Sequence, residues 1–303
     1  MDRLKIFFAL SRTPHGVIDM AAPALAALLC LGHFPPLPVI LVGIITVFAG
    51  YTAVYALNDL VDLRTDRQKV EIGGCSDDET CLDMDGVMMR HPLAKGALSF
   101  RAGLAWAVCW SLLAVAGAVW LNPVCLYLFL AGCLLEGLYC KLLQVTPLRA
   151  LINGAVKTLG SIAAVFAVDP SPSPLFLLAL FAWLFAWEIG GQNIPNDWTD
   201  IEEDRQFKAQ TIPVRLGLHR ATILIVVSLA AALFLNLFLF WVSPLTFGIL
   251  LMIVVVAVNV LLLLHPALLL AEKRKREMAM ALFNKASYYP LAMLGIVLVR
   301  LAY

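Results

Sequence analysis

Long apolar runs separated by short polar breaks dominate the sequence. A membrane-spanning helix needs about 20 mostly apolar residues, and the runs are long enough to supply nine such helices. We predict them at 17–32, 38–57, 99–120, 123–140, 148–168, 174–194, 219–241, 245–265 and 281–302. The pattern therefore predicts an all-α integral membrane protein, in which residues 1–303 form one bundle of nine transmembrane helices.

The breaks between the runs alternate in charge. Four of them, GHFPPLP, LNP, VDPSPSP and VSP, contain no Lys or Arg. Of the 22 Lys and Arg residues, only Lys157 and Arg300 lie outside the amino-terminal segment, the other connections and their flanks. Cytoplasmic loops of membrane proteins carry an excess of Lys and Arg. We therefore expect a bacterial inner (cell) membrane protein with a cytoplasmic amino terminus and an external carboxyl terminus.

The composition narrows the possible functions. Of the 303 residues, 61% are hydrophobic and 14% are charged, whereas a soluble domain has roughly 45–50% apolar and about 25% charged residues. This excess excludes a disordered chain, and a net charge of +1 gives no basic field for nucleic acid. Five of the seven cysteines lie in apolar runs and are expected to pack as small hydrophobic side chains. Cys75 and Cys81 lie in a polar segment and form only a weak zinc pattern.

The same polar motif follows the second and the sixth predicted helix. One copy runs from Asn58 to Arg67 and the other from Asn196 to Arg205, and both read N-D-x-x-D-x-x-x-D-R. Residues four apart share one face of a helix, so each copy places three oxygen-bearing side chains in a row. The rows are Asn58, Asp62 and Asp66 in the first copy and Asn196, Asp200 and Asp204 in the second.

Two such rows facing each other would suit Mg²⁺. This ion prefers oxygen ligands and usually takes one or two carboxylates together with substrate phosphates and water. The alternative is that each row is an ordinary acidic helix end at the membrane surface. Carboxylates at this spacing repel one another, so neither row gains stability for the fold. The identical register of the two copies favours a site for magnesium and a diphosphate.

The paired motifs resemble those of the UbiA superfamily of intramembrane prenyltransferases. Members have N-D-x-x-D-x-x-x-D after the second helix and D-x-x-x-D after the sixth helix of a nine-helix bundle. The stretch from Asp200 to Gly217, DIEEDRQFKAQTIPVRLG, resembles the second motif and its downstream T-x-P-V-x-x-G. Tyr139-Cys140-Lys141 and Asn153-Gly154 also resemble family positions. The resemblance implies a central cavity that opens near the cytoplasmic face.

The resemblance also implies an activity and roles for individual residues. The activity is Mg²⁺-dependent transfer of a polyprenyl group from a polyprenyl diphosphate to an acceptor. The implied metal ligands are Asn58 and Asp62, supported by Asp66, and Asp200 and Asp204, beside Asn196. Asp62 and Asp200 would be catalytic, Lys141 would contact the diphosphate, and Tyr139 would lie near the reacting carbon. Other cations near the motifs that could neutralise phosphate oxygens are Arg90, Lys95, Arg149, Arg205 and Lys208.

The sequence departs from the family pattern after the first motif. Relatives have a short link to R-P-x-x-x-G, whereas this chain has His91 in place of the Arg, with Arg90 before it. We expect a cytoplasmic loop over 67–98 with an insertion at about 70–88. The second motif is expected in a loop over 195–218, where Lys208 stands at a position that is often Gly in relatives. These departures leave the predicted metal ligands unchanged, but they weaken the prediction of the acceptor from the family.

A polar stripe is expected within the sixth helix. Glu188, Gln192, Asn196, Asp200 and Asp204 recur every four residues. Charged groups within spans are costly and are functional candidates by default. We consider two interpretations: Glu188 or Gln192 contacts the acceptor or orients a ligand, or the two form internal hydrogen bonds between helices.

Other polar and aromatic side chains within the spans are open to the same two interpretations. Lys157 either pairs with Glu136 or Glu188 or contacts a substrate. Four aromatic residues, Tyr51, Tyr55, Trp183 and Trp187, either line the cavity and face an allylic cation or pack between helices.

The acceptor follows only from the family's commonest chemistry, which favours an aromatic quinone precursor. Alternatives are a lipid, tetrapyrrole or sugar-phosphate acceptor. A transporter that uses the acidic rows to bind a cation or metabolite is the non-enzymatic alternative. Transporters bind near the midplane on interrupted helices, whereas both rows here lie at one interface. The expected partners are therefore a polyprenyl diphosphate, a small aromatic or lipid acceptor and membrane lipids, without nucleic acid.

Overall fold

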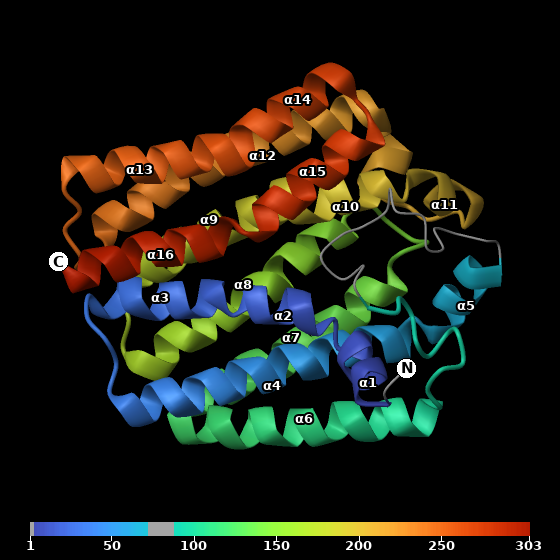
Figure 1. Ribbon diagram of the computed structural model, residues 1–303, viewed down its shortest axis with the longest axis horizontal. Helices are drawn as coiled ribbons and strands as arrows, with labels where there is room; N and C mark the ends of the chain where they lie inside the picture. The colour runs from blue at the N-terminus through green and yellow to red at the C-terminus, as the bar shows by residue number, and fades with distance from the viewer. Residues whose placement is uncertain (1–2, 72–87) are drawn as a thin grey trace.

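The computed structural model describes residues 3–71 and 88–303, and in these ranges the protein is an all-α bundle (Figure 1). Within the described ranges, nine helical spans are long and apolar enough to cross a membrane. The prediction of a nine-helix integral membrane protein is confirmed. The insertion expected at 70–88, with Cys75 and Cys81, lies almost entirely outside the described residues.

The nine spans consist of single helices or of helices joined end to end. The single helices are α4 (Leu37–Val61), α6 (Phe100–Leu121), α7 (Pro123–Lys141), α8 (Arg149–Val168) and α12 (Ile212–Val242). The joined helices are α2 (Thr13–Asp19) with α3 (Ala21–Leu31), α9 (Pro174–Trp187) with η3 (Glu188–Asn193) and α10 (Ile194–Thr199), α13 (Ile249–Asn259) with η4 (Val260–Leu264) and α14 (His265–Lys273), and α15 (Arg276–Ser287) with α16 (Tyr289–Ala302). In the part of the chain that the structure describes, three short helices lie outside the spans: α1 (Arg3–Leu10), α5 (Leu63–Glu71) and α11 (Ile201–Gln206).

Local sequence explains where several helices begin and end. Asn122 starts α7, because its side chain accepts a hydrogen bond from the Val124 N–H at 2.9 Å. Ser99 caps α6 in the same way, by accepting from the Ala102 N–H at 3.2 Å. Gly32 ends α3 with a φ of 74°, a left-handed conformation that glycine adopts without a steric cost.

Two spans contain a π-helical turn, and a proline follows each turn closely. The π-turn η3 precedes Pro195, and η4 precedes Pro266. A proline inside a helix has no N–H to donate and clashes with the preceding turn, so the wider π-turn lets the span continue through it. Both turns widen the helix in the middle of the bundle, and η3 carries Glu188 and Gln192.

Most predicted spans stop short of the observed helix ends. The sixth span continues from the predicted end at 194 to Thr199, the seventh begins at Ile212 instead of 219, and the eighth runs to Lys273 instead of 265. The segment 195–218, expected as a loop, is therefore mostly helical. Hydropathy marks where a helix leaves the apolar layer, whereas backbone hydrogen bonds carry the helix on into polar sequence.

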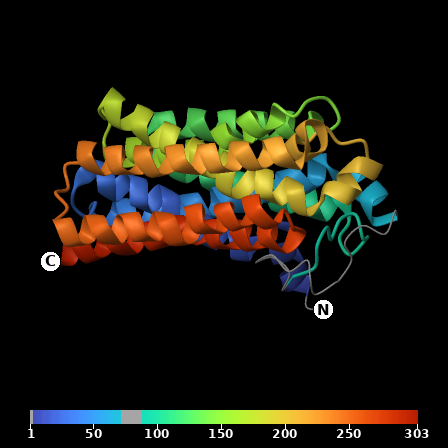
Figure 2. The same cartoon turned by 90° about the horizontal axis from the view of Figure 1, so that it is seen from above.

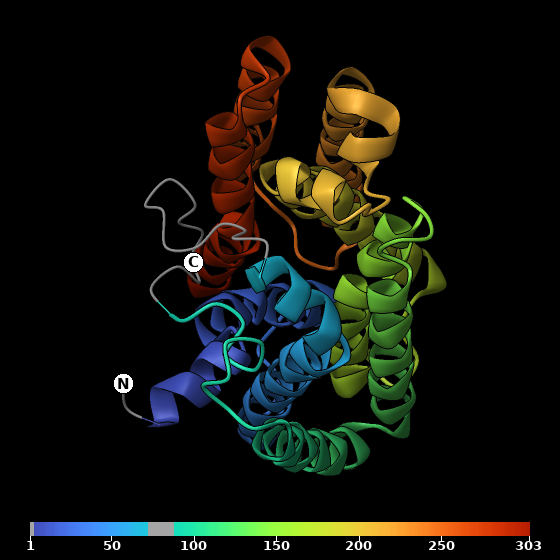
Figure 3. The ribbon, with the colours of Figure 1, turned by 90° about the vertical axis from the view of Figure 1, so that its right-hand side faces the viewer.

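The spans run lengthwise from one end of the bundle to the other (Figures 1 and 2). Contacts link α4 with α6, α7 with α8, and α9 with α12, while α3 lies against α8 and α16. The pair α2 and α3 is thus enclosed between α4 and the carboxyl-terminal helices. Figure 3 views the bundle from the end that carries α5 and α11, the end near which the N-terminus also lies. The C-terminus lies at the opposite end.

A polar network lies in the core between α9, α12, α13 and α16. Trp183 donates to the Tyr289 hydroxyl at 3.1 Å, Tyr289 donates to Asn259 Oδ1 at 2.9 Å, and Asn259 donates to Asn236 Oδ1 at 3.0 Å. Hydrogen bonds between helices stabilise membrane bundles where water is absent. Trp187 likewise donates to the Ala286 carbonyl at 3.1 Å. Trp183 and Trp187 therefore pack between helices, and neither lines the cavity described below.

Gly190 in η3 allows a close approach between the sixth and seventh spans. A Cβ atom at this position would lie 2.9 Å from the Ser228 Cβ and 3.0 Å from the Ile225 carbonyl oxygen. We expect Gly190→Ala to lower the free energy of unfolding by about 1–3 kcal/mol, because overpacking forces neighbouring atoms apart. Thermal unfolding of the purified protein in detergent measures this effect.

Gly137 in α7 provides the matched control. A Cβ atom there meets nothing within 4 Å, and alanine favours a helix over glycine by about 1 kcal/mol. Gly137→Ala should therefore leave the unfolding temperature unchanged or raise it. Equal effects of the two substitutions would contradict the tight packing of η3.

Candidate active site

One cavity of about 790 Å³ runs through the bundle, near the upper limit of typical small-molecule sites. At one end it is lined by residues of both acidic motifs, and this lining includes Asn58, Asp62, Asp66, Asn196, Asp200 and Asp204. At the other end it is lined by apolar and small side chains such as Val39, Gly43 and Ala167. Along α4, Val39 and Asp62 are separated by roughly 34 Å of helix rise. The cavity therefore combines a polar end with a long apolar extension.

The first row keeps its spacing although the helix breaks within it. α4 ends at Val61, and α5 begins at Leu63. The Asp62 N–H still donates to the Asn58 carbonyl at 2.9 Å, and the Asp66 N–H donates to the Asp62 carbonyl at 2.8 Å. Helical hydrogen bonding thus carries the row from the end of the membrane span to the short helix beyond it.

The second row is built in the same way. α10 ends at Thr199, and α11 begins at Ile201. The Asp204 N–H donates to the Asp200 carbonyl at 2.8 Å. The Thr199 hydroxyl donates to the Asn196 carbonyl at 2.7 Å and to Asp200 Oδ1 at 3.2 Å, which fixes the Asp200 side chain at the break.

The donor atoms of the two motifs fit a divalent cation that prefers oxygen ligands. All six side chains in the rows carry carboxylate or amide oxygens, and all line the one cavity. Asp59, Asp66 and His91 each bring a possible ligand atom to within 4.8 Å of the other two. His91 Nδ1 lies 3.0 Å from Asp66 Oδ2, in a backbone conformation with a φ of 51°. The residue that departs from the family's Arg thus contacts the first motif directly.

Arg149 places a cation beside the second motif. Its Nη2 donates to Asp197 Oδ1 at 3.0 Å, and its Cζ lies 4.4 Å from the centre of the Tyr139 ring. The side chain is buried and lines the cavity. Among the described residues, its Nε has no hydrogen-bond partner. A buried donor without a partner is costly, so a ligand oxygen in the cavity would complete the site.

Of the other Lys and Arg residues predicted to contact the diphosphate, only one lines the cavity. Arg90 lines the cavity, whereas Lys95, Lys141, Arg205 and Lys208 are exposed and lie outside its lining. Tyr139 faces the cavity, and Lys141 lies two residues further along the same helix. Because residues two apart on a helix point to nearly opposite sides, Lys141 cannot share the direction of Tyr139. Its expected contact with the diphosphate is not supported by this position.

Lys157 has a partner that the sequence did not indicate. Its Nζ lies 2.6 Å from Asp19 Oδ2 and 2.7 Å from the Tyr55 hydroxyl, which itself donates to Asp19 Oδ2 at 2.5 Å. The expectation that Lys157 pairs with Glu136 or Glu188 is therefore corrected. Glu136 instead accepts from the Asn58 amide at 2.6 Å, and Glu188 accepts from the Asn153 amide at 2.9 Å.

The polar stripe of the sixth span, which includes Glu188 and Gln192, both forms hydrogen bonds between helices and lines the cavity. Gln192 donates to the Phe283 carbonyl at 3.2 Å and accepts from the Ser287 hydroxyl at 3.2 Å, so it joins two spans. It also lines the cavity, as do Glu188, Tyr51 and Tyr55. The internal hydrogen bonds account for Gln192.

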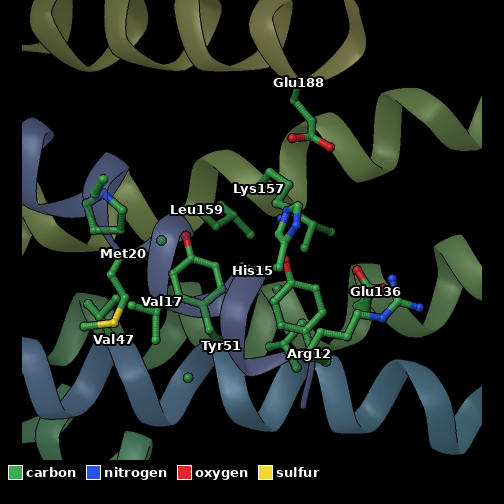
Figure 4. Close-up of a pocket in the computed structure, with 18 of the residues that line it drawn as sticks. Arg12, His15, Val17, Met20, Val47, Tyr51, Glu136, Lys157, Leu159 and Glu188 are labelled. Carbon is green, nitrogen blue, oxygen red and sulfur yellow. The ribbon is translucent and has the colours of Figure 1, made fainter. Parts of the chain in front are cut away.

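Three residues at the start of the first span lie at or beside the cavity wall, and the sequence did not indicate them. Arg12, His15 and Asp19 lie on α2 or just before it, and Arg12 and His15 line the cavity (Figure 4). Arg12 Nη2 lies 3.9 Å from Asp59 Oδ1, and His15 Nε2 lies 3.7 Å from Asp19 Oδ1. Asp19 was the only acidic residue in the first apolar run. That isolated charge was the signal that could have identified this group.

The model of one protein family matches residues 20–288, and its description is UbiA prenyltransferase family. The chain belongs to this family. It is accordingly a multi-pass membrane enzyme that transfers prenyl groups, as the resemblance of its motifs implied. The family assignment rests on most of the chain and does not depend on the acidic motifs alone.

Two curated relatives of this chain carry the names of two different enzymes. A digeranylgeranylglyceryl phosphate synthase from Methanoregula boonei is 28% identical over 139 residues, which are 44% of this chain and about half (48%) of that relative. A 4-hydroxybenzoate octaprenyltransferase from Shewanella woodyi is 24% identical over 233 residues, covering 76% of this chain and 75% of that protein.

Solved structures of UbiA homologs share the fold. A homolog from Archaeoglobus fulgidus bound to DMAPP and Mg²⁺ aligns with a TM-score of 0.70 and 15% identity, over 98% of this chain and 99% of that one. A homolog from Aeropyrum pernix K1 aligns with a TM-score of 0.67 and 21% identity, over 94% of this chain and 97% of that one. At these identities the alignment establishes the fold, and the chemistry must be argued from the residues.

Proposed function

We propose that this protein transfers a prenyl group from a prenyl diphosphate to an acceptor in a Mg²⁺-dependent reaction. The observation that carries the proposal is the convergence of both acidic rows on one cavity with an apolar extension. The Archaeoglobus fulgidus homolog, which has the same fold, is bound to DMAPP and Mg²⁺. A diphosphate with an apolar tail matches the two kinds of lining in this cavity.

The residues of the cavity suggest how the reaction is supported. Asn58, Asp62 and Asp66 would hold one metal ion, and Asn196, Asp200 and Asp204 would hold another. When bound, Mg²⁺ supplies Lewis-acid neutralisation of the diphosphate. Arg149 lines the cavity and its Nε has no hydrogen-bond partner among the described residues, which supports a role for its guanidinium as a donor to a diphosphate oxygen.

The apolar walls of the cavity contribute to the same chemistry. As the allylic carbon–oxygen bond breaks, the allylic carbon gains positive charge, and water would capture it. Apolar side chains exclude water from this carbon. Tyr139 lines the polar end of the cavity, where the electron-rich face of its ring can stabilise a cation.

We propose an aromatic quinone precursor as the acceptor. The Shewanella woodyi relative, which matches three quarters of this chain, is named a 4-hydroxybenzoate octaprenyltransferase. The cavity is lined by Tyr51, Tyr55, His15 and Phe283, whose rings suit a flat aromatic molecule.

We also propose that the protein lies in the bacterial inner membrane with its amino terminus in the cytoplasm. This placement is supported by the distribution of Lys and Arg and by the N-terminus lying near the end that carries the motifs.

Purified protein in detergent tests the proposal directly. We expect labelled geranylgeranyl diphosphate, Mg²⁺ and an aromatic acceptor to give a prenylated product. Removing divalent ions with a chelator should reduce product formation to background, and added Mg²⁺ should restore it, because the carboxylate rows otherwise repel the diphosphate. The acceptor panel should include a glycerophosphate lipid. Product formed equally well in excess chelator, or from no acceptor in the panel, would contradict the proposal.

A further inference from the structure

Beneath the acidic motifs, the cavity has a second polar level in the middle of the bundle. Side chains from four spans meet there, and we call them the polar floor: His15 and Asp19 from α2, Tyr55 from α4, Lys157 from α8 and Glu188 from η3. Figure 4 shows Glu188 pointing from its helix toward Lys157 and His15. The Arg149–Asp197 pair of the diphosphate end lies two helical turns along α8 from Lys157.

Within the polar floor, Lys157 is already neutralised. Its Nζ contacts Asp19 at 2.6 Å and the Tyr55 hydroxyl at 2.7 Å. Because Asp19 balances its charge, Lys157 offers little attraction to a second anion. An anionic group bound at this level would also lie near the Glu188 carboxylate, which disfavours it.

Glu188 is the incomplete member of the polar floor. Its side chain is 2% exposed, and Oε1 accepts from the Asn153 amide at 2.9 Å. Among the described residues, its Oε2 has no hydrogen-bond partner. Leaving a buried carboxylate oxygen without a donor is costly. A ligand with a hydrogen-bond donor would satisfy this oxygen.

Aromatic rings form the walls next to Glu188. The Tyr51 and Tyr55 rings stack with centres 6.3 Å apart, and His15 meets Tyr55 edge to face at 6.1 Å. His15 also stacks on Phe283 at 5.8 Å. All four rings line the cavity, so the group bound here is expected to be flat and aromatic.

The distance from Glu188 to the acidic motifs decides what Glu188 can do. Glu188 and Asp200 are separated by roughly 18 Å of helix rise. Glu188 therefore cannot touch the diphosphate or reach the allylic carbon held beside it. The intervening part of the cavity leaves room for an acceptor that lies between the two ends.

We infer that Glu188 accepts a hydrogen bond from the hydroxyl group of an aromatic acceptor, and that Tyr51, Tyr55 and His15 hold the acceptor ring. The inference rests on the proposed function and adds the recognition element for the acceptor. Glu188 is a binding residue that selects hydroxylated rings, and it takes no part in breaking the donor's carbon–oxygen bond. A carboxylate on the other side of the ring would point toward the motif end, where Arg12 lines the cavity.

A pair of matched probes tests this role. 4-Hydroxybenzoate and 4-methoxybenzoate carry the same charge and ring, but only the first can donate a hydrogen bond to Glu188. We expect the wild-type protein to bind the hydroxyl compound about tenfold or more tightly, because a hydrogen bond to a carboxylate is lost in the ether. Isothermal titration of the full chain in detergent, without a prenyl donor, measures both dissociation constants.

Glu188→Gln should bring the two dissociation constants to within about twofold. The glutamine can keep the Asn153 contact while it presents an N–H group instead of an acceptor oxygen. Glu272→Gln, which changes an exposed residue of α14 outside the cavity lining, should keep the wild-type preference. Tyr51→Leu should weaken both probes equally, because it removes a stacking ring and leaves Glu188 in place.

The outcomes separate this inference from the proposed function. A preference for the hydroxyl compound that survives Glu188→Gln in a folded protein overturns the inference, and so does a wild-type protein without any preference. An unfolding temperature of Glu188→Gln close to that of the wild-type protein checks that the variant is folded. If that variant does not fold, a preference that persists in Glu188→Met, which removes both carboxylate oxygens at a similar side-chain length, also overturns the inference. Failure of the wild-type protein to prenylate any acceptor would contradict the proposed function, and the binding test would still stand.

Discussion

Asp62→Ala is expected to lower kcat/KM for the prenyl diphosphate at least about a hundredfold, and Asp200→Ala is expected to do the same. Each carboxylate lies at the break that ends a membrane span, in the centre of its row, and both line the cavity. Replacing either aspartate by alanine removes the central carboxylate from the row of side chains that would hold the metal ion. Groups that stabilise developing charge in a transition state typically contribute factors of about 10²–10³ in rate. Turnover of labelled geranylgeranyl diphosphate at saturating acceptor measures the loss.

Glu202→Ala is the matched control for this prediction. Glu202 lies two residues after Asp200, but its side chain is 78% exposed and pairs with Arg205 at 3.1 Å. It does not line the cavity, so its loss should leave turnover within about twofold of wild type, as for most surface substitutions. If Asp62→Ala and Asp200→Ala both remain as active as Glu202→Ala, the assignment of the two rows to the metal is wrong.

Excess Mg²⁺ distinguishes a weakened site from an absent one. A conservative variant, Asp200→Asn, keeps an oxygen but loses the charge. We expect part of its activity to return at high Mg²⁺, because the ion concentration compensates for weaker binding. Asp200→Ala should not be rescued. If the activity of Asp200→Asn and of Asp200→Ala depends on the Mg²⁺ concentration in the same way as wild-type activity, the metal binds elsewhere in the cavity.

The parts of the site that could be predicted are those fixed by local helix geometry. The rows of Asn58, Asp62 and Asp66 and of Asn196, Asp200 and Asp204 follow from a spacing of four residues, and the hydrogen bonds of each row keep that spacing across a helix break. The family resemblance added that the two rows belong to one site. The nine spans were equally local, because each is a continuous apolar run.

The parts that could not be predicted depend on contacts between distant segments. Lys157 and its partner Asp19 are 138 residues apart, and Arg149 and Asp197 are 48 residues apart. Neither pairing follows from periodicity, because it depends on how α2, α8 and α10 pack. The outward position of Lys141, in contrast, was available from the sequence. Its offset of two residues from Tyr139 on one helix already implied opposite faces.

Arg149→Lys is expected to lower kcat/KM for the prenyl diphosphate about 10- to 100-fold, whereas Lys141→Ala should leave it within about twofold of wild type. Arg149 is buried at the cavity wall with its Nε unpartnered among the described residues, and Lys141 is exposed. A hydrogen bond to a charged group contributes about 1.5–3 kcal/mol, which corresponds to this range of rates. Lysine keeps the charge near Asp197 but loses the planar fork that can contact a carboxylate and a phosphate together.

The lysine variant is preferred because Arg149→Ala would leave Asp197 buried beside an empty space, and breaking a buried ion pair can cost about 3–5 kcal/mol in stability. A loss caused only by misfolding would lower the unfolding temperature of Arg149→Lys and reduce transfer to every substrate alike. A lost diphosphate contact instead weakens competitive inhibition by inorganic diphosphate and leaves acceptor binding unchanged. The opposite ranking, with Lys141→Ala impaired and Arg149→Lys normal, would return the diphosphate contact to Lys141. It would also require α7 to turn its outer face inward during catalysis, because Tyr139 and Lys141 cannot face the cavity together.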